Sequence, residues 1–137
     1  MVKIGIIGTG STIGIAKNHI GAYKCCPDAV ITAVYDIRNE RAQQTIDQME
    51  LHDAKACTSL EELFHLCDAV SICTPNATHV ELTVQALKAG KHVLCEKPFA
   101  PTPEECDEAV KYAELTGKVS MIGLCYRDIP GFVYMKQ

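Results

Sequence analysis

The sequence predicts a doubly wound parallel α/β fold, in which one sheet carries helices on both of its faces. Three observations predict this class. Short apolar runs alternate along the chain with stretches of helical spacing, the runs are nearly continuous, and a glycine-rich turn follows the first run. The 137 residues, 47% of them hydrophobic and 22% charged, fit one domain with a packed core.

Each apolar run has the length of a strand that is buried on both faces. We expect strands at 2–8, 29–36, 68–74, 91–97 and 118–124, and helices at 39–50, 59–66, 78–89 and 103–116. Gly90 and Gly117 follow the last two helices, where a left-handed cap is needed. Right-handed crossovers between such strands place the ligand crevice beyond their carboxyl ends.

Composition excludes several classes of protein. The net charge is −4 and the 13 Lys and Arg residues are scattered, so we expect no nucleic-acid partner. The start MVKIGIIG is a buried strand rather than a signal peptide or a membrane span, which predicts no membrane partner and a cytoplasmic location. The eight cysteines form no C-x-x-C pair, so we expect reduced thiols and no metal site.

The turn after the first strand reads GTGSTIGIA and nearly matches the fingerprint G-x-G-x-x-G. Gly8 and Gly10 fit it, but Ile13 stands where the third glycine is expected and Gly14 comes one residue later. Glycines here let the backbone approach a pyrophosphate at the start of a helix. The alternative is a turn that only packs. We interpret Ser11, Thr12 and Ile13 as a lengthened phosphate loop, in which the two hydroxyls add donors.

Asp36 ends the second strand, 26 residues after Gly10. An acidic residue near this spacing accepts hydrogen bonds from the adenosine ribose, which favours NAD. Arg38 offers a partner for a 2′-phosphate, so NADP stays open as well. The alternative interpretation of Asp36 is a solvated turn residue that opens the next helix.

Two further motifs follow later strands. Thr74 and Pro75 end the strand at 68–74, and Asn76 or Thr78 can cap the helix after it. After the strand at 91–97, Pro98 holds Lys97 out of the helical region beside Glu96. A lysine in this place can donate to a substrate oxygen during hydride transfer, although a surface salt bridge is the simpler alternative.

These motifs together resemble the N-terminal domain of the glucose-fructose oxidoreductase, inositol dehydrogenase and MocA family. The resemblance is carried by IGIIGTG at 4–10, YDIRNERA at 35–42, TPNATH at 74–79, ALKAGKHVLCEKP at 86–98, PTPEE at 101–105, and Arg127 with Pro130. It implies a Rossmann-like NAD(P)-binding domain, and an oxidoreductase that oxidises sugar, polyol or cyclitol hydroxyls or catalyses the reverse reductions.

The resemblance also implies roles for individual residues. Gly8 and Gly10 would lie at the pyrophosphate and Asp36 at the adenosine ribose. Thr74, Pro75, Asn76 and His79 would line the nicotinamide side, Glu96 would face the nicotinamide ribose, and Lys97 would contact the substrate as the catalytic residue. Ser11, Thr12 and Ile13 depart from the family's pattern, as an insertion of about three residues after Gly10. For His79, a packing or capping role is the alternative.

Family members carry a second α/β domain that completes the substrate pocket. We therefore expect a nucleotide-binding domain at 1–124 and, in 125–137, the start of that second domain, which is otherwise absent from this sequence. The chain alone is then expected to be inactive, with exposed apolar side chains at 132–135 and self-association into a homo-oligomer. One alternative is a non-catalytic dinucleotide-binding or redox-sensing module. Another is a coenzyme A-binding domain, which the carboxylate of Asp36 disfavours because the adenosine ribose of coenzyme A carries a 3′-phosphate.

Overall fold

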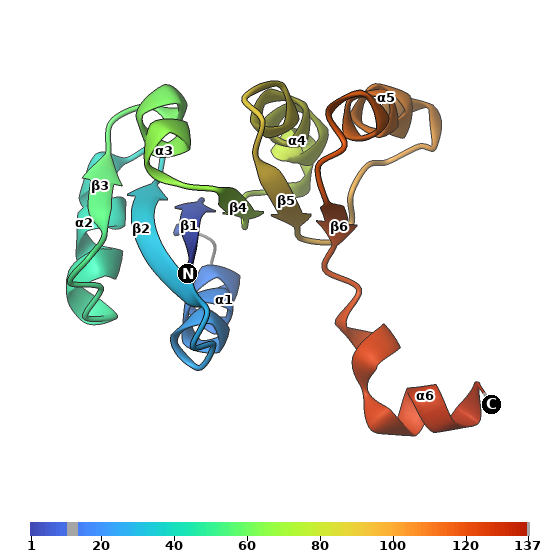
Figure 1. The fold of residues 1–137 in the computed structure, drawn as a ribbon, viewed down its shortest axis with the longest axis horizontal. Coiled ribbons are helices and arrows are strands. Elements are labelled where there is room, and N and C mark those ends of the chain that lie inside the picture. Colours follow the sequence, from blue (N-terminus) through green and yellow to red (C-terminus); the bar gives the residue numbers. More distant parts are fainter. Residues whose placement is uncertain (11–13, 137) are drawn as a thin grey trace.

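The structure, a computed structural model, describes residues 1–10 and 14–136 and contains one six-stranded sheet. The strands are β1 (Val2–Ile7), β2 (Ala29–Tyr35), β3 (Lys55–Cys57), β4 (Ala69–Ile72), β5 (His92–Cys95) and β6 (Ser120–Ile122). All neighbouring pairs are parallel, in the order β3-β2-β1-β4-β5-β6 (Figure 1). The chain thus winds outward from β1 in both directions, which confirms the predicted fold class and puts the switch point between β1 and β4.

Helices cover the two faces of the sheet. They are α1 (Ile15–Lys24), α2 (Asn39–Gln48), α3 (Leu60–Leu66), α4 (His79–Lys88), α5 (Asp107–Thr116) and α6 (Pro130–Met135), with 3₁₀ turns η1 (Asn76–Thr78), η2 (Glu104–Cys106) and η3 (Cys125–Asp128). Ile20 of α1 and Ile46 of α2 pack in one core cluster, whereas Leu63 of α3 and Leu87 of α4 pack in a second one. The same strands contribute side chains to both clusters, because successive side chains of a strand point to opposite faces of the sheet. This is expected for a sheet that is buried on both faces.

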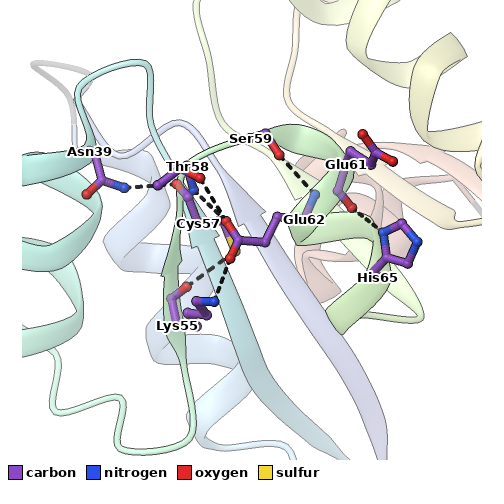
Figure 2. A network of polar contacts seen from close by, with 8 residues as sticks. All are labelled: Asn39, Lys55, Cys57, Thr58, Ser59, Glu61, Glu62 and His65. Carbon is purple, nitrogen blue, oxygen red and sulfur yellow. Dashed lines mark hydrogen bonds and ion pairs between the residues drawn. The ribbon is translucent and has the colours of Figure 1, made fainter.

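Strand β3 is an element that the sequence analysis missed. It has three residues and no apolar run, and its place at the edge of the sheet is secured by polar contacts with α3 (Figure 2). Lys55 Nζ lies 2.6 Å from Glu62 Oε1, and the Thr58 N–H donates to Glu62 Oε2 at 2.8 Å. These contacts lower the pKa of Glu62 to about 2, with the Lys55 bond as the largest cause.

The same network fixes the beginning of α3. Ser59 caps the helix, because its side-chain oxygen accepts a hydrogen bond from the Glu62 N–H at 3.1 Å. Across from it, the Asn39 side-chain amide at the start of α2 donates to the Cys57 carbonyl at 3.0 Å (Figure 2). The ends of β3, α2 and α3 are therefore held together, with Leu60 at a defined place beside the carboxyl end of β2.

Beyond β6 the chain leaves the sheet. Residues of η3 and α6 lie apart from the sheet and its covering helices (Figure 1). The side chains of Phe132, Val133, Tyr134 and Met135 are 43% to 78% exposed, so the expected exposed apolar surface is present. No helix in the described part of the chain combines the length and the apolar character needed to cross a membrane.

Candidate functional site

The residues that directly follow the strands lie in one row at the carboxyl edge of the sheet. Backbone hydrogen bonds continue beyond the strands: Gly8 N–H donates to the Tyr35 carbonyl at 2.8 Å, and Cys73 N–H to the Ile7 carbonyl at 2.8 Å. Glu96 N–H donates to the Ile72 carbonyl at 3.0 Å. The parallel register therefore places the glycine turn, Asp36, Thr74 and Lys97 along the same edge, although the first and last are about ninety residues apart in sequence.

Gly8 lets two turns of this row touch. Its φ of +88° is in the left-handed region, and a Cβ there would lie 2.6 Å from Thr74 Cγ2 and 3.0 Å from the Thr74 backbone nitrogen. At Gly10, an added Cβ would collide with the Arg41 guanidinium, whose Nη1 donates to the Gly10 carbonyl at 3.4 Å. Glycine is thus required at Gly8, where the neighbour is backbone, whereas at Gly10 the end of the flexible Arg41 side chain can move away.

Asp36 is buried at the end of β2, with a side chain that anchors the glycine turn. Its Oδ2 accepts hydrogen bonds from the Thr9 N–H at 2.8 Å and the Thr9 hydroxyl at 3.0 Å, while Oδ1 accepts from the Arg38 N–H at 3.0 Å. A carboxylate has about four lone-pair positions. One acceptor position on Oδ1 therefore stays available for an external hydroxyl group.

A pocket of about 430 Å³ opens beside this carboxylate, at the ends of β1, β2 and β4. Five predicted site residues line it, namely Gly8, Gly10, Asp36, Thr74 and Pro75. Arg38, Asn76, His79, Glu96 and Lys97 do not line it. The pocket therefore brings together the residues predicted for the pyrophosphate and the adenosine ribose with the turn after β4.

Sequence reasoning missed several residues of the pocket wall. The structure places Arg41 rather than Arg38 in the wall, together with Leu82 and Gln85 of α4. A helical signal was available, because Thr78, Leu82 and Gln85 follow one another at spacings of four and three residues, on one face of a helix. Arg41 brings a cation to the same pocket that Asp36 and Glu81 make acidic.

The N-terminus of α1 fits an anionic group. Gly14 precedes the helix in the left-handed region, no side chain of the described residues caps the helix, and its first turn holds no acidic residue. The free N–H groups and the positive end of the helix dipole are thus left for an anion. Ser11, Thr12 and Ile13, predicted to lengthen the phosphate loop, lie outside the described residues.

Glu96 is directed toward α1. Its Oε1 lies 3.0 Å from His19 Nε2, and His19 Nδ1 lies 2.6 Å from the Ser71 hydroxyl. This order of groups has the connectivity of a nucleophilic triad, but the Ser71 side chain is fully buried in β4 and inaccessible to a substrate. The Glu96–His19–Ser71 contacts therefore join β4 and β5 to α1.

His79 and Lys97 differ sharply in exposure. The His79 ring is 1% exposed, and its nitrogens lie 2.8 Å from the Pro98 carbonyl and 2.8 Å from the Thr74 carbonyl. Lys97 is exposed at the end of β5, and its peptide bond to Pro98 is cis. The predicted nicotinamide contact of His79 stays a prediction, as does the substrate contact of Lys97.

The cysteines Cys73 and Cys95 near this edge are buried thiols, and the described residues contain no group of metal ligands. Burial raises the pKa of Cys73, which lines the pocket, to about 12, and that of Cys95 to about 12. These thiols stay protonated and behave as small apolar groups. In residues 1–10 and 14–136, no three His, Cys, Asp or Glu side chains are grouped to hold a metal ion.

Comparison with known proteins shows the family to which the chain belongs. Residues 2–124 match the model of an oxidoreductase family with an NAD-binding Rossmann fold. The chain is 35% identical to glucose-6-phosphate 3-dehydrogenase of Bacillus subtilis over 127 residues, 93% of this chain and 35% of that protein. It is 34% identical to scyllo-inositol 2-dehydrogenase (NADP(+)) of the same organism over 139 residues, covering 100% of this chain and 41% of the relative.

Solved structures agree with the sequence matches. UDP-N-acetylglucosamine 3-dehydrogenase from Acidithiobacillus ferrooxidans superposes with a TM-score of 0.87 at 32% identity, over 99% of this chain and 42% of that one. The chain thus spans 35% to 42% of the length of these proteins.

Proposed function

Since the chain belongs to the glucose-fructose oxidoreductase, inositol dehydrogenase and MocA oxidoreductase family, we propose that it is the dinucleotide-binding part of an NAD(P)-dependent dehydrogenase or reductase. The proposed substrate is a sugar, polyol or cyclitol, the class named for the related dehydrogenases. The observation that carries the proposal is the pocket in which Asp36, the Gly8–Gly10 turn and Thr74–Pro75 meet at the switch point of the sheet.

The free acceptor position on Asp36 Oδ1 supports a role in binding the adenosine ribose. We propose NAD as the preferred cofactor, because a carboxylate at this place repels a 2′-phosphate. Arg41, in the pocket wall, is better placed than Arg38 to pair with such a phosphate, and it is the residue that would permit NADP.

Lys97 is the proposed catalytic residue. When bound, the nicotinamide ring supplies or accepts a hydride. The Lys97 ammonium group would donate a hydrogen bond or a proton to the substrate oxygen as a carbonyl is reduced, and the amine would take the proton as a hydroxyl is oxidised. Its exposure at the end of β5 leaves the group accessible to a substrate.

We propose that residues 125–137 begin the second domain, and that 1–124 bind the dinucleotide. The exposed apolar side chains of α6 support this division, since a covering domain would remove them from water. By itself the 137-residue chain is then expected to bind the cofactor with little turnover, because water stays in contact with the nicotinamide side.

Calorimetric titration of the chain with NAD, NADP and coenzyme A tests the proposal. We expect saturable binding of NAD, weaker binding of NADP, and no binding of coenzyme A, whose ribose carries a 3′-phosphate. Failure of both nicotinamide dinucleotides to bind at millimolar concentration would overturn it. A binding module without chemistry predicts the same titrations, but it also predicts no turnover when the relatives' second domain is supplied.

A further inference from the structure

The two ring nitrogens of His79 both face carbonyl oxygens. Nδ1 lies 2.8 Å from the Pro98 oxygen and Nε2 lies 2.8 Å from the Thr74 oxygen. A carbonyl oxygen only accepts hydrogen bonds, and a neutral imidazole has only one N–H to donate. Turning the ring over does not help, because it would replace both nitrogens with carbons. A ring that carries two protons satisfies both oxygens.

Neither carbonyl has a substitute donor. Within the described part of the chain, the Thr74 and Pro98 oxygens accept no hydrogen bond other than those from His79. A neutral ring would therefore leave one nitrogen lone pair pointing at an oxygen lone pair, with no donor among the described residues to relieve it.

We propose that His79 is a buried imidazolium that clamps the turn after β4 to the turn after β5, and is thereby a positioning residue for Lys97. The ring joins Thr74, in the pocket wall, to Pro98, directly after Lys97. The role of Lys97 rests on the proposed function, whereas the charge of the ring rests on its hydrogen-bond geometry and does not involve a cofactor.

Opposing terms act on this charge. Burial at 1% exposure and the N-terminal position on α4 disfavour a cation, while two charge-assisted hydrogen bonds favour it. Three charged side chains lie close in the sequence to His79 or to its partner Pro98, namely Glu81 on α4, and Glu96 and Lys97 after β5. None of these three has a hydrogen bond to the ring in the structure. The two carbonyl dipoles must therefore carry the stabilisation.

The contact of His19 with Glu96 acts on the same segment from the other face of the sheet. His19 belongs to α1, which packs in the core cluster opposite to that of α4, and its Nε2 lies 3.0 Å from Glu96 Oε1. Lys97 thus lies between Glu96, which contacts His19, and Pro98, whose carbonyl contacts His79. His19 differs in that a neutral ring satisfies both of its partners, the carboxylate and the Ser71 hydroxyl.

Nitrogen-15 NMR of the chain labelled in its histidine rings tests the charge directly. At neutral pH we expect both ring nitrogens of His79 to carry protons that exchange slowly with water, whereas the exposed His52 shows rapid exchange. The resonance is assigned by its loss in His79→Gln, and among the five histidines it is also recognisable in the wild-type spectrum by its two slow ring protons. The proposal is overturned if every histidine ring whose N–H proton exchanges slowly with water has its other nitrogen unprotonated.

The positioning role is tested by hydrogen exchange at the Lys97 and Thr78 amides. Both N–H donors of glutamine are on one nitrogen, whereas the two carbonyls face opposite sides of the His79 ring. In His79→Gln we therefore expect one carbonyl to lose its donor, and exchange to accelerate about tenfold or more. His65→Gln, on the exposed side of α3, is the matched control and should change neither amide. Equal rates in wild type and His79→Gln would refute the clamp. Because neither measurement uses a cofactor, both outcomes are independent of whether NAD binds.

Discussion

Replacement of Asp36 by serine is expected to reverse the cofactor preference. In the structure the carboxylate has one acceptor position left on Oδ1, while its other contacts hold the Thr9 and Arg38 backbone. A hydrogen bond to a charged acceptor contributes about 1.5–3 kcal/mol, so loss of the carboxylate should weaken NAD binding by about 10- to 150-fold. Removal of the charge also removes a repulsion of about 3 kcal/mol for unit charges roughly 5 Å apart at an effective dielectric constant of about 20. NADP binding should therefore strengthen.

Calorimetric titration of wild type and Asp36→Ser with both dinucleotides measures this effect. The matched control is Thr9→Val, which removes the hydroxyl donor to Asp36 but keeps the carboxylate and the Thr9 N–H. We expect its NAD affinity to stay within a few-fold of wild type. The reasoning is refuted if Asp36→Ser binds NAD as tightly as wild type, or if its preference between NAD and NADP is unchanged in a protein that still melts cooperatively.

Three further predictions concern the turn, the edge strand and the proposed catalytic lysine. Gly8→Ala should lower the free energy of unfolding by about 1–3 kcal/mol, because the Cβ meets the Thr74 backbone. Gly21→Ala, in open space inside α1, should raise the free energy of unfolding by about 0.5–1 kcal/mol. Equal melting temperatures for the two glycine variants would contradict this contrast. Glu62 has its pKa lowered from 4.5 to about 2, so its stabilising contribution is present above pH 4.5 and is lost as the pH falls toward 2. The melting-temperature difference between wild type and Glu62→Gln should shrink over that range, and a constant difference, as expected for Glu61→Gln, would refute the ion-pair argument. In a protein that includes the relatives' second domain, Lys97→Met should reduce turnover about 100-fold or more at unchanged NAD affinity. A loss of only a few-fold would contradict the catalytic role and favour the alternative interpretation of Lys97 as a surface salt-bridge residue.

The row of strand-end residues was predictable because it needs little tertiary information. Continuous apolar runs predict parallel strands, and parallel strands put all of their carboxyl ends at one edge. Gly8, Asp36, Thr74 and Lys97 were therefore expected at the same edge, and the structure places them there. The glycine caps were predictable for a similar local reason, since Gly90 and Gly117 both adopt positive φ values after a helix.

Strand β3 was missed for a physical reason. Its three residues carry no apolar run, and they are held by parallel pairing with β2 and by contacts such as the Lys55–Glu62 pair and the Asn39–Cys57 hydrogen bond (Figure 2). Local propensity contains little of that energy. The choice between Arg38 and Arg41 is similar, because only the path of α2 past Gly10 brings the Arg41 guanidinium to the pocket wall.

By itself the sequence determined the fold class, the edge of the sheet that carries the site, and the family of the chain, since each depends on periodicity or on motifs that are contiguous in the chain. The tertiary structure alone decided which polar groups meet. It directs Glu96 to His19, encloses Ser71, and sets His79 between two carbonyls from different turns. Such contacts join groups up to 77 residues apart, and their distances depend on how helices pack on the two faces of the sheet, which no local pattern encodes.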